Sequence, residues 1–162
     1  WPHLDAIVAR VMLAYPDTHI VLVGDEACRI LEAGWEQEPR IHCQSGKWTI
    51  RESMSFAEVA DLIIGCETGL LNAAGSMNTP KIVTLSHSSE EMLTKHWKNT
   101  IALSQPKGRG CPKQPCRQLH HNWDHCMKHE ETGTAMCQFN IDIETMWNAV
   151  ASVLGMAQQR VA

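Results

Sequence analysis

The stretch that decides the fold is Ala60-Asp61-Leu62-Ile63-Ile64-Gly65-Cys66-Glu67-Thr68-Gly69-Leu70-Leu71-Asn72-Ala73-Ala74. Its apolar run, Leu62 to Gly65, is short and continuous, which is typical of a strand buried on both faces of a parallel sheet. A Glu-Thr-Gly turn follows, and the small and apolar residues after that turn favour a helix. A buried strand that turns directly into a helix indicates an α/β fold.

The same alternation of strands and helices continues on both sides of this stretch. Further strands are predicted at His19–Val23, Arg40–Cys43, Lys81–Leu85 and Ile101–Ser104. Helices are predicted at residues 3–14, Glu26–Glu32, Ser55–Ala60, Leu70–Met77 and Ile143–Gln158, the third opened by a Ser55/Glu58 capping box. This order predicts a Rossmann-like α/β domain with a mainly parallel sheet of about five to six strands. Ligands of such domains bind where loops follow the carboxyl ends of the strands.

Composition excludes several classes of protein. The chain has 162 residues, 44% of them hydrophobic, and a net charge of −4, which suits one globular domain rather than a disordered chain. No apolar run approaches the roughly 20 residues of a membrane helix. The pI near 6.1 argues against nucleic acid as a partner, and the local basic patch is interpreted as a solvated loop; it contains Lys107, Arg109, Lys113 and Arg117. Because Trp1 leads at once into a helical pattern, we expect a piece of a longer polypeptide.

The Glu-Thr-Gly turn is the candidate binding site. The backbone N–H groups at the start of the following helix are free to bind an anion, and Thr68 adds a hydroxyl donor. Gly69 lets a ligand approach the backbone closely. Glu67 would repel a bare phosphate, so its carboxylate suits sugar hydroxyls beside the phosphates. The alternative is an ordinary helix start with Thr68 as its cap.

The passage from Phe56 to Leu85 resembles the carboxyl-terminal domain of the heptosyltransferase family of glycosyltransferases, which add sugars to bacterial lipopolysaccharide cores. The shared features are Ala-Asp-Leu-Ile-Ile-Gly, the Glu-Thr-Gly turn, the helix, and the strand start Thr-Pro-Lys-Ile-Val. The Trp1-Pro2 opening and the segment from Asp17 to Gly24 resemble the start of that domain. The resemblance extends from Trp1 to Leu85, and it implies the carboxyl-terminal half of a glycosyltransferase-B fold.

The resemblance implies roles for individual residues. Glu67 takes the place of the acidic residue, commonly Asp, that binds the donor sugar, and Thr68 and Gly69 would hold the diphosphate. Asn72 stands where the family commonly has His. These two departures leave the identity of the sugar open.

Two residues outside the turn are further candidates for donor binding. Glu26 would contact the ribose or base, or it is an acidic residue favoured by the dipole in the first turn of a helix. Ser88 would contact the nucleotide, or Ser88 or Ser89 caps a helix together with Glu91.

The implied activity is transfer of a sugar from a nucleotide-sugar donor, with an ADP-heptose-like donor favoured. The implied acceptor is a glycan or a lipid-linked molecule, held by an amino-terminal domain that also supplies the general base. This sequence would therefore contain no catalytic residue. The chemistry of the family needs no metal. The enzyme is expected in the cytoplasm, peripheral at the inner membrane in its full-length form.

A Cys/His-rich segment is the second cluster that could carry chemistry. We predict a core over 1–105, this segment as an appendage over 106–140, and a helix packing on the core over 141–162. The segment holds Cys111, Cys116, Cys126 and Cys137, interleaved with His120, His121, His125 and His129. Because the cysteine spacing matches no standard zinc finger, three states stay open, namely a structural zinc site, disulfides and free thiols. The rival function is a noncatalytic binding module that uses this segment for a metal or a partner.

The remaining thiols, Cys28, Cys43 and Cys66, fall in or beside predicted core elements, where Cys behaves as a small apolar residue. The chain has seven cysteines, an odd number, and this favours the cytoplasm over an oxidising compartment.

Overall fold

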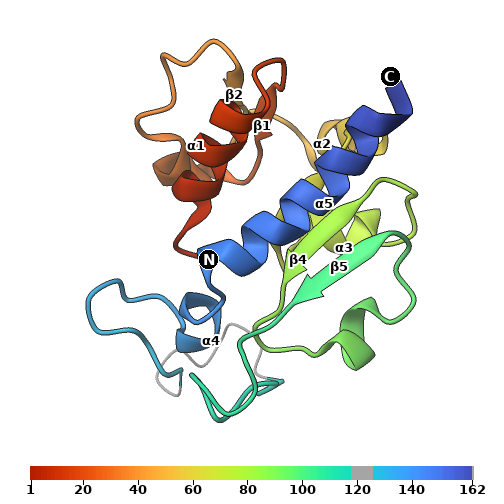
Figure 1. The fold of residues 1–162 in the computed structure, drawn as a ribbon. Coiled ribbons are helices and arrows are strands. Elements are labelled where there is room, and N and C mark those ends of the chain that lie inside the picture. Colours follow the sequence, from red (N-terminus) through yellow and green to blue (C-terminus); the bar gives the residue numbers. More distant parts are fainter. Residues whose placement is uncertain (118–125, 162) are drawn as a thin grey trace. The chain divides into compact units, whose positions relative to one another are not determined.

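The computed structural model describes residues 1–117 and 126–161 (Figure 1). Helices and strands alternate along the chain, as predicted. In order, the elements are α1 (Leu4–Ala14), β1 (Ile20–Leu22), the 3-10 helix η1 (Glu26–Glu32), β2 (Ile41–Cys43), α2 (Ile50–Val59), β3 (Ile63–Cys66), α3 (Gly69–Ala74), β4 (Lys81–Thr84), the π-helix η2 (Glu90–Thr94), β5 (Thr100–Leu103), α4 (Met136–Phe139) and α5 (Ile143–Val161). No helix in the described ranges is long and apolar enough to cross a membrane.

The strands form two parallel sheets rather than the one sheet predicted. Strand β1 pairs with β2, and β4 lies between β3 and β5 in a three-stranded sheet. The α/β class and the parallel strands are therefore confirmed. The described residues form five strands, the lower end of the predicted number, and these strands are divided between two sheets.

The chain divides into two compact units, His3–Phe56 and Trp1–Pro2 with Ala57–Ala162. In the first unit, Val8 and Met12 of α1 pack with Ile41 of β2, and Trp35 covers this core. The Arg40 side chain closes the end of α1, because its Nη1 donates to the Pro16 carbonyl at 2.7 Å and also to the carbonyl of Met12.

The second unit is built around β4, whose four residues are all buried. Leu71 of α3 packs against Val83 and Leu85, and Trp97 covers the same cluster. Helix α5 contacts β5 and contributes Met146 and Val150, both of which are fully buried (Figure 1). The central strand β4 is therefore buried along its whole length, and only the loops beyond its ends can reach the surface.

Helix α2 begins five residues earlier than predicted, and its capping box is a different one. Thr49 N donates to Glu52 Oε2 at 2.7 Å, while Glu52 N donates to Thr49 Oγ1 at 3.3 Å. The predicted pair, Ser55 and Glu58, lies exposed inside the helix. The same Ser/Thr-x-x-Glu pattern occurs at both places, and the upstream copy captures the first free N–H groups.

Candidate functional site

Two loops leave the three-stranded sheet at the same edge. Strands β3 and β4 are adjacent and parallel, and their last residues, Cys66 and Thr84, are register partners. The turn over residues 67–69 and the loop over residues 85–88 therefore emerge side by side at the carboxyl ends of the strands. This is the position at which α/β domains bind their ligands.

The Glu67 carboxylate ties these two loops together. Its Oε2 accepts hydrogen bonds from Ser86 N at 3.0 Å, His87 N at 3.2 Å and the Ser86 hydroxyl. His87 Nδ1 lies 2.8 Å from the same oxygen. The other oxygen, Oε1, accepts from Ser88 N at 2.9 Å. The Glu67 side chain is 3% exposed, so nearly all of its contacts are with the chain itself.

The charged form of this carboxyl is favoured in the folded protein. Burial alone would raise the pKa of Glu67, but hydrogen bonds from the Ser86 hydroxyl and from the N–H groups of Ser86 and Ser88, together with His87, outweigh it. The pKa of Glu67 is therefore lowered from its ordinary value. At neutral pH this carboxylate is therefore ionised, so it holds the loop over residues 86–88 and does not act as a proton donor.

Thr68 and Gly69 form an exposed turn next to Glu67. Thr68 is the N-cap of α3, as the alternative interpretation expected, although its Oγ1 accepts from Leu71 N at a long 3.5 Å. A Cβ built on Gly69 would meet no heavy atom within 4 Å. Packing within this unit therefore does not require glycine there. Asn72, one turn further along, is also exposed.

The two serines that the sequence offered as a helix cap differ in their contacts. Ser89 caps η2, because its hydroxyl accepts from Met92 N at 3.3 Å. Ser88 is buried, and its backbone N–H is the one held by Glu67 Oε1. Ser88 therefore belongs with the candidate site through its backbone.

Glu26 belongs to the other unit of the chain, His3–Phe56. It is exposed in the first turn of η1, and its carboxylate pairs with Arg29 at 2.6 Å. Its role in donor binding stays a prediction.

The sequence interpretation missed part of this edge. Gln114 Nε2 donates to the Leu85 carbonyl at 2.8 Å, and Arg117 N donates to the His87 carbonyl at 2.9 Å. A loop assigned to solvent is thus attached to the segment that Glu67 holds, and it brings the exposed Arg117 beside it. A local sequence pattern cannot predict a contact between residues about thirty positions apart.

Among the described residues, no disulfide joins the four cysteines of the predicted metal site, and the four differ in exposure. Cys137 is buried, Cys111 and Cys116 are half-buried, and Cys126 is exposed. His120, His121 and His125 lie outside the described residues. Within residues 1–117 and 126–161, no three His, Cys, Asp or Glu side chains already stand together as a metal site. Of the predicted core thiols, Cys66 is exposed, because it is the last residue of β3.

Comparison with protein-family models and with curated proteins found no match. Among solved structures, the chain is similar to the structure of E. coli ADP-heptose LPS heptosyltransferase II, with a TM-score of 0.68 and 15% sequence identity. The match covers 98% of this chain and 43% of that enzyme's chain. The likeness confirms the α/β fold expected from the sequence, and the chain spans less than half the length of that enzyme.

Proposed function

We propose that this chain is the donor-binding part of an inverting, heptosyltransferase-like glycosyltransferase. The observation that carries the proposal is the fold, which matches part of such an enzyme over 98% of the chain. The Glu67-Thr68-Gly69 turn and the loop held by Glu67 provide the donor site at the carboxyl edge of the three-stranded sheet. The donor we favour is an ADP-sugar of the heptose type, and the product belongs to a lipopolysaccharide or another surface glycan.

The open space at Gly69 supports a diphosphate at this turn. Because no atom of the chain fills the position of a Cβ there, a phosphate oxygen can reach the backbone N–H groups directly. The Thr68 hydroxyl is exposed beside it and provides a side-chain donor. Both groups would stabilise the charge that collects on the leaving diphosphate.

Glu67 has limited capacity for a sugar. A carboxylate offers about four lone-pair sites, two on each oxygen. Within residues 1–117 and 126–161, Oε2 is fully engaged by Ser86 and His87, whereas Oε1 accepts only from Ser88. One sugar hydroxyl can therefore donate to Oε1. The first role of Glu67 is to position the loop over residues 86–88.

In the proposed reaction, the acceptor hydroxyl attacks the anomeric carbon from the face opposite the diphosphate. The new C–O bond forms as the bond to the diphosphate oxygen breaks, and that oxygen leaves with the electron pair. A general base takes the hydroxyl proton. We assign the base and the acceptor, a glycan or lipid-linked molecule, to a separate domain. We place the whole enzyme in the cytoplasm, at the inner membrane surface.

Replacing Thr68 with alanine should weaken the binding of ADP roughly 10- to 100-fold. This range corresponds to the loss of a hydrogen bond to a charged group, worth about 1.5–3 kcal/mol. Isothermal titration calorimetry of the wild type, Thr68→Ala and Thr68→Ser measures the change in ADP affinity. The control is Thr68→Ser, which keeps the hydroxyl and should bind ADP within about threefold of the wild type. Equal affinity in all three proteins would remove Thr68 from the site.

Replacing Gly69 with alanine separates binding from folding. The free energy of unfolding should stay equal or rise by up to about 1 kcal/mol, because the site has room for a methyl group and alanine favours a helix. ADP affinity should fall at least about tenfold, since the methyl group blocks close approach to the backbone. Chemical denaturation and calorimetry on the same samples test both parts. If neither the wild type nor this variant binds any nucleoside diphosphate, the proposed function is wrong, and stoichiometric zinc in that case would favour the noncatalytic module.

A further inference from the structure

The basic loop, residues 104–117, follows β5 and has no part in the donor site as described so far. It contains four cations and no Asp or Glu, in a chain whose net charge is −4. The sequence interpretation assigned these cations to solvent; they are Lys107, Arg109, Lys113 and Arg117. The hydrogen bonds of the loop place its last residue at the carboxyl edge of the three-stranded sheet instead.

Two hydrogen bonds attach the end of the basic loop to the segment that Glu67 holds. Gln114 Nε2 donates to the Leu85 carbonyl at 2.8 Å, and Arg117 N donates to the His87 carbonyl at 2.9 Å. The backbone N of His87 donates in turn to Glu67 Oε2 at 3.2 Å. A single residue, His87, therefore links the backbone of Arg117 to the carboxylate of the proposed donor turn.

The rest of the basic loop is tied to itself. The Gln105 side chain binds both backbone groups of Cys111, accepting from its N at 2.7 Å and donating to its carbonyl at 2.6 Å. The backbone N of Gln114 donates to the same carbonyl at 3.3 Å. Since Gln105 lies two residues after β5 and Gln114 is bound to Leu85, the loop is held at both ends.

Arg117 itself has a distinctive conformation. Its φ is 56°, in the left-handed region that residues other than glycine seldom adopt, and such a conformation persists where surrounding contacts hold it. Its side chain is exposed. No carboxylate in the described part of the chain forms an ion pair with it, so its charge is available to an anion.

A diphosphate at this edge needs a cation, because the ionised Glu67 would otherwise repel it. The stretch over residues 60–91, which contains both loops of the edge, has one Lys or Arg, and that residue is Lys81. Lys81 is fully buried at the start of β4, and its Nζ donates to two backbone carbonyls. It therefore lies at the amino end of the strand, away from the proposed donor turn.

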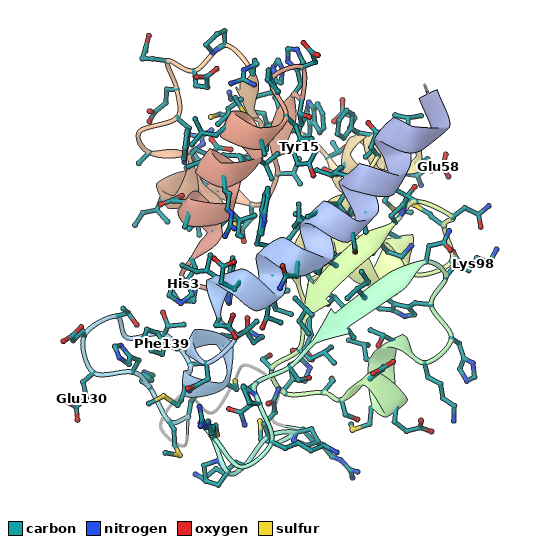
Figure 2. The ribbon with its side chains drawn as sticks, viewed as in Figure 1. His3, Tyr15, Glu58, Lys98, Glu130 and Phe139 are labelled. Atoms are coloured by element: carbon teal, nitrogen blue, oxygen red, sulfur yellow. The ribbon has the colours of Figure 1, made fainter. Side chains whose placement is uncertain are left out.

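The next cations along the chain do not serve this edge either. The Lys95 side chain pairs with Glu91. Lys98 precedes β5, at the end of that strand away from the basic loop (Figure 2). Arg117, by contrast, is bonded through its backbone to the carboxyl edge itself.

We propose that the Arg117 guanidinium binds the diphosphate of the nucleotide-sugar donor, so that the basic loop forms one wall of the donor site. This inference rests on the proposed function and adds a residue that holds the charged part of the substrate. A guanidinium is always charged, and its paired N–H donors match two phosphate oxygens. Thr68 and Arg117 are both exposed, so neither has to displace a core residue to reach the same ligand.

Arg117→Ala should weaken the binding of ADP about 10- to 100-fold, the range expected for the loss of a hydrogen bond between charged groups. Arg117→Lys keeps the charge without the paired donors, so its affinity should fall between those of the wild type and Arg117→Ala. The matched control is Arg109→Ala. Arg109 is an exposed cation of the same loop, but its N donates to the Pro106 carbonyl within that loop, and this variant should bind ADP within about twofold of the wild type. Isothermal titration calorimetry of the full chain measures all four affinities.

Two further measurements separate a contact with the ligand from a structural role. The ADP affinity of the wild type should fall more steeply with added salt than that of Arg117→Ala, because the lost interaction is the one that salt screens. Arg117→Gly removes the charge but suits the left-handed backbone, so its midpoint of urea unfolding should equal or exceed that of the wild type. Its ADP affinity should nevertheless fall as far as that of Arg117→Ala.

The outcomes distinguish this inference from the proposed function. If Thr68→Ala weakens ADP binding while Arg117→Ala and Arg109→Ala bind equally well, Arg117 does not contact the diphosphate and the proposed function stands. If the wild type binds no nucleoside diphosphate, both are wrong.

Discussion

Replacing Glu67 with alanine is expected to lower the free energy of unfolding by about 3–5 kcal/mol, the usual cost of removing one partner of a buried charged network. The Glu67 side chain is 3% exposed, and it binds three consecutive backbone N–H groups, those of Ser86, His87 and Ser88. Alanine leaves these donors without their acceptor and leaves a cavity beside them. Urea denaturation followed by circular dichroism measures the change.

Glutamine at the same position separates charge from shape. In Glu67→Gln the amide oxygen can still accept from Ser86 and His87, but its NH2 group faces the N–H of Ser88, so we expect a smaller loss of about 1–3 kcal/mol. Glu58→Gln is the control, because Glu58 is exposed on α2; it should change stability by no more than about 0.5 kcal/mol. A loss below about 1 kcal/mol in Glu67→Ala would show that the carboxylate does not hold the loop.

The pH dependence of this contribution has a defined sign. Because the pKa of Glu67 is lowered in the folded state, the carboxylate stabilises the fold fully above its unfolded pKa of about 4.3. That contribution is lost as the pH falls through the folded pKa. The stability difference between the wild type and Glu67→Gln should therefore be constant near neutral pH and shrink below about pH 4.3.

The parts of the fold that depend on local patterns were predictable. Each of the five strands in the described part of the chain overlaps a predicted strand, and the Glu-Thr-Gly turn was correctly placed where β3 leads into α3. The start of α2 was wrong, because Thr49 and Glu52 offer the same capping pattern as Ser55 and Glu58 and the sequence does not rank them. The short helix α4 was not predicted, and η2 was anticipated only through its cap at Ser88 or Ser89, since elements of four or five residues carry little periodicity.

The candidate site was only half predictable for a different reason. Thr68 and Gly69 lie in one turn, so their exposure follows from the strand and the helix that flank them. The partners of Glu67 are 19–21 positions away, and they meet it only because β3 and β4 pair in register. The Glu67 carboxylate, expected from the sequence to bind a sugar, also accepts hydrogen bonds from three backbone N–H groups, which the sequence did not predict. Arg117 and His87 are still further apart in the sequence, so their contact could not be predicted either.

Leu71→Ala is the second substitution expected to have a large effect, a loss of about 2–5 kcal/mol in the free energy of unfolding. Leu71 is 2% exposed, and it packs against Val83 and Leu85 in the core around β4. The same residue supports the donor turn, since its N–H reaches Thr68 Oγ1 and its side chain lies against Gly65. Truncation therefore removes core contacts and the packing that supports the turn before α3, so ADP affinity should fall as well.

The matched control is Leu13→Ala, another leucine in a helix, which is 84% exposed and should shift stability by no more than about 0.5 kcal/mol. If the two units unfold in separate transitions, Leu71→Ala should move only the transition of the unit that contains Ala57–Ala162. A movement of the other transition, or a loss no larger than that of Leu13→Ala, would contradict the position of Leu71 in this core. ADP affinity of Leu71→Ala should also be measured in an osmolyte that restores the stability of the folded state. A loss of affinity that remains there would come from the displaced Thr68-Gly69 turn. The Leu71 side chain has no polar group that could bind a nucleotide.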